Sequence, residues 1–183
     1  MCENLGEHLS IKQQIEKATA EIFLKLFNNH FKTVYQITSL SDSPDIKCID
    51  KNTNLTLNLE ITLLEDINGE IGYLLGKGKK PFISPNTGLP CTSFSDDSIP
   101  KLEKRLDEKG DVNYGQRTAL VIRQTSPLWF AEDWASHRSK MDNKTINNLK
   151  LNYEAGVWII CTNNNTWPAK YDIYELIEHS IDI

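Results

Sequence analysis

The segment from Leu55 to Leu64 constrains the fold more than any other part of the chain, because aliphatic and polar residues alternate along it. Successive side chains of a β-strand point to opposite faces of the sheet, so this period of two predicts a strand with one apolar face. The opposite face carries Thr56, Asn58, Glu60 and Thr62. The chain is therefore expected to build a sheet in which Glu60 stands on the more polar face.

Two shorter strands are expected before this segment. Residues 33–38 are rich in β-branched and aromatic side chains, and Ile46 and Cys48 alternate with polar residues. Residues 41–44 and 50–54 consist mostly of turn-forming residues. The pattern predicts an antiparallel hairpin or meander, in which the turn at 50–54 folds the long strand back on its neighbour.

Two amphipathic helices are expected on either side of this meander. The first covers residues 11–28, with Ser10 as its N-cap and an apolar stripe made of Ile11, Ile15, Ala18, Ile22 and Leu26. The second covers residues 99–109, where Ile99, Leu102 and Leu106 follow helical spacing and Gly110 is placed to end the helix. On a helical wheel, Lys109 lies close to this second stripe.

The C-terminal part predicts two buried strands at 118–122 and 156–161 and a helix at 143–153. Residues 169–177 fit either an edge strand or a last short helix. Trp129, Phe130 and Trp134 are expected in the core or an interface, although such rings can also stack on bases. The order of elements indicates a single α/β domain over residues 1–183, with a mixed central sheet flanked by helices.

Residues 66–100 interrupt this order, because glycine and proline crowd the segment. A loop of this length in a compact domain is typically a lid or a binding loop. It contains the basic run 76–80, which lacks the GxxxxGK[ST] spacing of a nucleotide-binding loop. The run fits a contact to nucleic-acid phosphates and a solvated lid equally well.

Composition narrows the class of protein. No stretch approaches eighteen consecutive apolar residues, and the first residues lack the pattern of a secretory signal, so a cytoplasmic protein is expected. The cysteines and histidines show none of the usual zinc-site spacings. A net charge of −5 argues against a protein that coats nucleic acid by bulk electrostatics, but leaves a nuclease with a local basic surface open.

Two acidic residues stand where metal chemistry would need them. Asp45 follows Pro44 at the start of one strand, and Glu60 lies on the next, so both can face the same side of the sheet. Magnesium favours one or two carboxylates and keeps water and substrate oxygens as its other ligands. Two acids on paired strands can therefore hold one ion beside a phosphodiester.

The residues Pro44-Asp45 and Glu60-Ile61-Thr62, with the order of helix, meander, helix and strand, resemble the PD-(D/E)xK nuclease superfamily. The resemblance covers roughly residues 10–125. It implies a restriction-endonuclease-like three-layer sandwich that hydrolyses DNA or RNA with Mg²⁺ or Mn²⁺. The ion would be held by Asp45, Glu60 and the main-chain carbonyl of Ile61.

Thr62 departs from the family motif, which has lysine at this position. Some members appear to supply the lysine from the following helix, and here the candidate is Lys109, because Lys101 and Lys104 point further from the buried stripe. A glutamate from the first helix often assists in the superfamily. Glu16 and Glu21 are the candidates, and each also fits an ordinary solvated charge.

Other interpretations remain open. Asp45 fits a turn residue that bonds its own backbone, and Glu60 fits a solvated charge on a strand. The main alternative is a catalytically silent module with the same fold that binds nucleic acid or a protein partner. A homo-oligomer is also possible. If Asp45 and Glu60 lie far apart, the chain is an unrelated α/β interaction protein.

Overall fold

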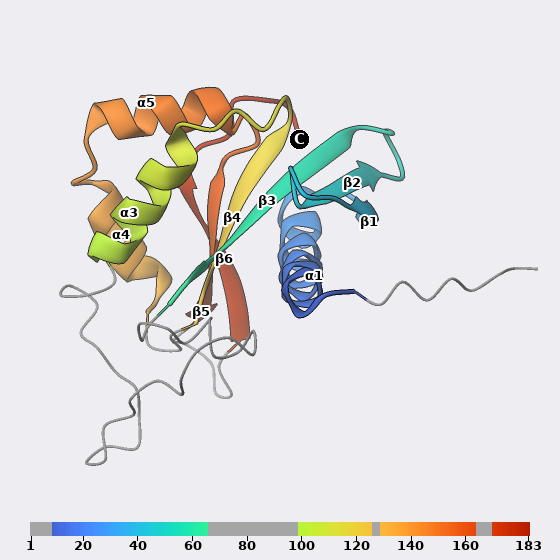
Figure 1. Ribbon diagram of the computed structural model, residues 1–183, viewed down its shortest axis with the longest axis horizontal. Coiled ribbons are helices and arrows are strands. Elements are labelled where there is room, and N and C mark those ends of the chain that lie inside the picture. The colour runs from blue at the N-terminus through green and yellow to red at the C-terminus, as the bar shows by residue number, and fades with distance from the viewer. Residues whose placement is uncertain (1–8, 66–98, 126–128, 164–169) are drawn as a thin grey trace, which may run out of the picture.

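The computed structural model describes residues 9–65, 99–125, 129–163 and 170–183. These residues form one six-stranded sheet in which the strands lie side by side in chain order (Figure 1). The strands are β1 (Tyr35–Leu40), β2 (Ile46–Asp50), β3 (Thr56–Leu64), β4 (Thr118–Gln124), β5 (Val157–Asn163) and β6 (Lys170–Ile177).

The sheet is mixed. Strands β1, β2 and β3 form the expected antiparallel meander, and β3, β4 and β5 run parallel to one another. β6 returns antiparallel to β5 along the far edge, so the alternative of a short helix at 169–177 is wrong. The turn before β3 is fixed by Asp50, whose buried carboxylate accepts hydrogen bonds from the N–H groups of Val34, Asn52 and Thr53.

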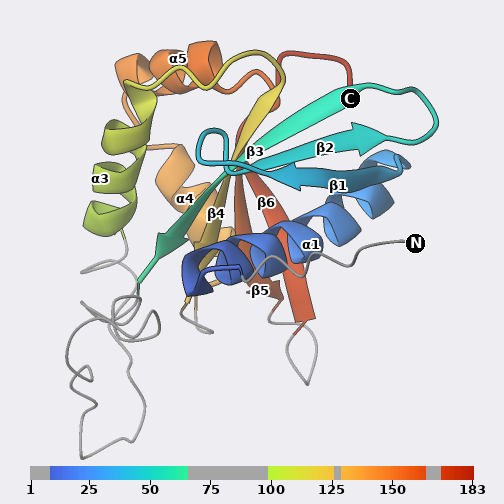
Figure 2. The same ribbon diagram turned by 45° about the vertical axis from the view of Figure 1, so that its right-hand side comes forward.

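Helices cover both faces of the sheet (Figure 2). The described helices are α1 (Ile11–Phe31), α3 (Ile99–Gly110), α4 (Ala131–Arg138) and α5 (Asn143–Asn152). One core lies between α1 and the sheet around Phe23, Phe27 and Trp158. A second lies on the opposite face, where α3, α4 and α5 pack around Leu102, Leu106 and Trp134. The α/β class with a mixed, helix-flanked sheet is confirmed.

The apolar stripe expected for α1 is wrong. Ile11 is 50% exposed and Ala18 is exposed, whereas the buried face carries Glu16, Thr19, Ala20, Phe23, Leu24 and Phe27. The aromatic rings decide the phase, because they bury more apolar area than the smaller aliphatic residues of the other stripe. The helix also continues three residues beyond the expected end, to Phe31, and Lys32 follows in the left-handed conformation.

Three other expectations meet the structure differently. Trp129 and Trp134 are buried in the second core, as expected, and their rings pack edge to face. Helix α4 was not expected, because it spans only eight residues and buries only Trp134 and His137. The expected loop 66–100 lies outside the described residues except for its last two, which begin α3. Among the helices of the described residues, none combines the length and apolarity needed to cross a bilayer.

Candidate functional site

The candidate site forms where β2 stops and β3 runs on. Ile46, the first residue of β2, pairs with Leu59, so the last five residues of β3 extend past their neighbour. Asp45 takes the place of the missing strand, because its Oδ2 accepts a hydrogen bond from the N–H of Ile61 at 2.8 Å. The N–H and C=O of one strand residue point to the same side, so the carbonyl of Ile61 also faces this edge.

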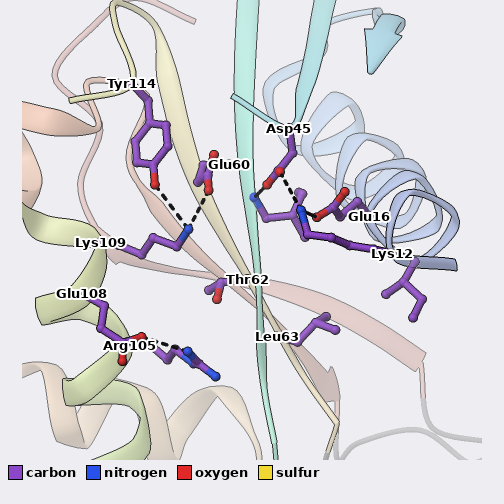
Figure 3. Close-up of a pocket in the computed structure, with 12 residues that line it drawn as sticks. Lys12, Glu16, Asp45, Glu60, Thr62, Leu63, Arg105, Glu108, Lys109 and Tyr114 are labelled. Atoms are coloured by element: carbon purple, nitrogen blue, oxygen red, sulfur yellow. Dashed lines mark hydrogen bonds and ion pairs between the residues drawn. The ribbon is translucent and has the colours of Figure 1, made fainter. Parts of the chain in front are cut away.

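A hollow of about 400 Å³ opens at this point, between the first turns of α1, the end of β3 and helix α3. Its walls include four residues that the sequence singled out, together with Thr62 at their centre (Figure 3). The four are Asp45, Glu60, Ile61 and Lys109. The fold therefore brings residues from three separate segments of the chain to one pocket.

Glu60 and Lys109 form a direct ion pair across this pocket. The Nζ of Lys109 lies 2.6 Å from Oε1 of Glu60 and 3.3 Å from the hydroxyl of Tyr114. Glu60 is only 4% exposed, because α3 covers the face of β3 that the sequence presents as polar. The second carboxylate oxygen, Oε2, is buried without a hydrogen-bond partner.

Asp45 has its own group of neighbours on the α1 side (Figure 3). Lys12 Nζ lies 3.6 Å from Oδ1 of Asp45 and 2.6 Å from Oε1 of Glu16. Asp45 is 4% exposed and Glu16 is 7% exposed, whereas the Lys12 side chain is mostly solvated. The expectation that Glu16 is a solvated charge is therefore wrong, and Glu21, which is exposed, does not line the pocket.

Burial and mutual repulsion set the charge states of these groups. Burial raises the pKa of Glu60, the hydrogen bond from Lys109 opposes the rise, and the negative charge of Asp45 adds to it. Glu16 also has a raised pKa, mainly because of burial and because Asp45 lies close. Burial of Lys109 opposes its charged form, but the hydrogen bond and charge of Glu60 outweigh it and raise the pKa of Lys109. Lys109 is therefore held as an ammonium ion.

The donor set fits a hard divalent cation. Carboxylate and carbonyl oxygens are the ligands that Mg²⁺ and Mn²⁺ prefer, and Oε2 of Glu60 offers a lone pair that the described residues leave unused. No three acidic, histidine or cysteine side chains of the described segments already converge to hold an ion by themselves. Magnesium needs only one or two carboxylates, so Asp45 and Glu60 suffice with the carbonyl of Ile61.

The structure separates the lysines as helical phase predicts. Lys109 lines the pocket, whereas Lys101 and Lys104 do not, and Lys104 is exposed beside Glu108. Thr62 is 9% exposed and lies between β3 and α3, so Lys109 reaches the pocket beside the position where the family motif has lysine.

Sequence reasoning missed Lys12, Glu16 and Tyr114 as parts of this pocket. The first two follow from the correct phase of α1, because Glu16, Ala20, Phe23 and Phe27 share one face and Lys12 stands one turn before Glu16. Tyr114 lies beyond the end of α3, and no spacing rule connects it with Glu60. Its place depends on how the chain returns from α3 to β4.

Comparison with protein families, with curated proteins and with solved structures gave no match for this chain: no family model, no curated protein and no solved structure is similar to it.

Proposed function

We propose that this chain is a Mg²⁺- or Mn²⁺-dependent nuclease with a restriction-endonuclease-like fold, which hydrolyses phosphodiester bonds in DNA or RNA. One observation carries the proposal: Asp45, Glu60 and Lys109 come from three segments and line the same pocket. The order of helix, antiparallel meander, helix and parallel strand supports the same assignment.

Each residue has a role that its surroundings support. Asp45, Glu60 and the carbonyl of Ile61 would hold the ion, which when bound supplies positive charge to the phosphate and makes a water more acidic. Lys109 is positively charged and donates hydrogen bonds into the pocket, so it can orient a water or stabilise charge that develops on the phosphate. Tyr114 positions that ammonium group through its hydroxyl.

The decisive test is Lys109→Ala, assayed with single- and double-stranded DNA and RNA in Mg²⁺ or Mn²⁺. Removing one preorganised donor from a reacting group costs on the order of a hundredfold in turnover. Lys109→Ala is expected to lose about that much, while metal affinity changes little. Lys104→Ala is the matched control, because Lys104 lies on the same helix with its side chain mostly exposed. Equal turnover in wild type and Lys109→Ala would remove this lysine from the mechanism.

A catalytically silent module of the same fold is the second candidate. It is favoured by the ion pairs that already neutralise the acids, with Lys109 on Glu60 and Lys12 beside Asp45 and Glu16. Thr62 at the motif position favours it as well. In the same assay, a wild-type protein that cleaves none of the four substrates but retains binding to one of them would establish this reading.

A further inference from the structure

A second surface continues from the candidate site across the same end of the sheet. Leu63 lines the site and is the register neighbour of Arg123 on β4. The Nη1 of Arg123 donates to Oγ1 of Thr19 on α1 at 3.3 Å, and its guanidinium lies 5.8 Å from the ring centroid of Tyr171 on β6. Arg123 therefore connects the pocket to the far edge of the sheet along the α1 side.

A hollow of about 520 Å³ lies beyond Arg123, between α1 and the start of β6. Its described walls are Ile22, Leu26, Tyr171, Lys25 and Lys170, and none of these is acidic. Tyr171 is 48% exposed, and both lysines are exposed. Figure 1 shows the end of β3 and the start of β6 at the same end of the sheet. We call the surface from Leu63 through Arg123 to this hollow the α1–β6 track.

We propose that the α1–β6 track binds a single-stranded nucleic acid whose chain runs on into the candidate site; this inference rests on the proposed nuclease function. Single strands are bound by cationic grooves that follow the phosphates, combined with aromatic rings on which bases stack. The track has both parts, with Arg123, Lys25 and Lys170 as cations and Tyr171 as the ring. Its local positive charge contrasts with the net charge of −5 of the whole chain.

The apolar walls explain why the strand should be single. Bases within a duplex are stacked on one another, so they cannot enter a hollow lined by Ile22 and Leu26 or lie flat on Tyr171. Arg123 fixes the ring while nearly half of the Tyr171 surface stays open to solvent. Neighbouring strands are about 4.8 Å apart, so β3 and β6 are separated by roughly 14 Å, and a strand that reaches both must span several nucleotides.

The test measures binding without cleavage. Fluorescence anisotropy of labelled DNA and RNA strands of about 12 nucleotides, a length typical of single-strand sites, is recorded with the full chain in EDTA. Tyr171→Ala is expected to weaken binding about tenfold through loss of stacking, whereas Tyr171→Phe keeps it. Lys25→Ala and Lys170→Ala should each lower the salt dependence by about 0.7 per phosphate contact. Lys144→Ala, an exposed lysine on α5 across the sheet, is the matched control and should change neither.

The outcomes separate the track from the nuclease. Equal affinity of Tyr171→Ala and wild type for single strands overturns the track, even if metal-dependent cleavage persists. Tighter binding of a blunt duplex than of its separate strands overturns it as well. Tyr171-dependent binding by a chain that cleaves no substrate supports the track and removes the nuclease. Preference of the Tyr171-dependent binding for DNA or for RNA identifies the substrate.

Discussion

At the scale of single residues, the carboxyl group of Glu16 shows what the candidate site costs the fold. It lies buried on α1, and Asp45 and Glu60 repel its negative charge, while Lys12 compensates only in part. Its pKa is therefore raised, which means that the folded state binds a proton more tightly than the unfolded chain does. The ionised form destabilises the fold at neutral pH, and this cost disappears as the pH falls below the ordinary carboxyl value of 4.5.

Glu16→Gln is expected to raise the free energy of unfolding at pH 7 by about 1 kcal/mol, the size of a typical single stabilising substitution. The gain should shrink towards zero at about pH 4, where the wild-type carboxyl is protonated in both states. Urea unfolding at the two pH values measures the difference. Glu21→Gln, on the exposed side of the same helix, is the control and should change stability little at either pH. A loss of stability at pH 7 would contradict the argument.

At the scale of elements, Gly156 controls how β5 enters the sheet. Its φ is +90°, and a Cβ there would lie 2.8 Å from Nε1 of Trp158 and 3.0 Å from the carbonyl oxygen of Ile177. Gly156→Ala is therefore expected to cost about 1–3 kcal/mol through backbone strain and the close contact. Gly110→Ala is the matched control, because its nearest neighbour, Leu149 Cδ2, is 3.8 Å away. Thermal unfolding of both variants gives the comparison, and equal melting temperatures would refute it.

The elements also show how far sequence reasoning reaches. Strand β3 follows from alternation alone, and the phase of α3 correctly places Leu102 and Leu106 inside and Lys109 at the pocket. The phase of α1 was wrong, because spacing was counted without the weight of Phe23 and Phe27. Helix α4 escaped because two turns carry too few periodic positions. Local patterns thus predict where an element lies, whereas burial of Glu16 depends on which face the sheet covers.

At the scale of the whole molecule, metal binding and folding are expected to be linked. Asp45 and Glu60 come together only in the folded chain, so an ion that binds them stabilises the native state alone. At a concentration of one hundred times its dissociation constant, Mg²⁺ should add about 2.7 kcal/mol to the free energy of unfolding. Thermal unfolding across a Mg²⁺ titration measures this gain.

Asp45→Asn is the matched variant for that titration. It should unfold in a single transition like the wild type but respond much less to Mg²⁺, because the charged oxygen is lost while a hydrogen-bond acceptor for Ile61 remains. An identical Mg²⁺ response in this variant would place the ion elsewhere. Absence of any wild-type response at millimolar Mg²⁺ would favour the silent module.

The overhang of β3 beyond β2 bears on solubility as well as on chemistry. An uncovered strand edge with aliphatic residues is a template for pairing with other chains, and natural proteins protect such edges with charge or with covering segments. Here Asp45 binds the N–H of Ile61 at that edge. A chain that replaced Asp45 with alanine would lose a metal ligand and uncover a sticky strand in the same step. Descendants of this chain that gave up catalysis would therefore still be under pressure to keep an oxygen at position 45, and retention of that residue would not by itself show that an enzyme is active.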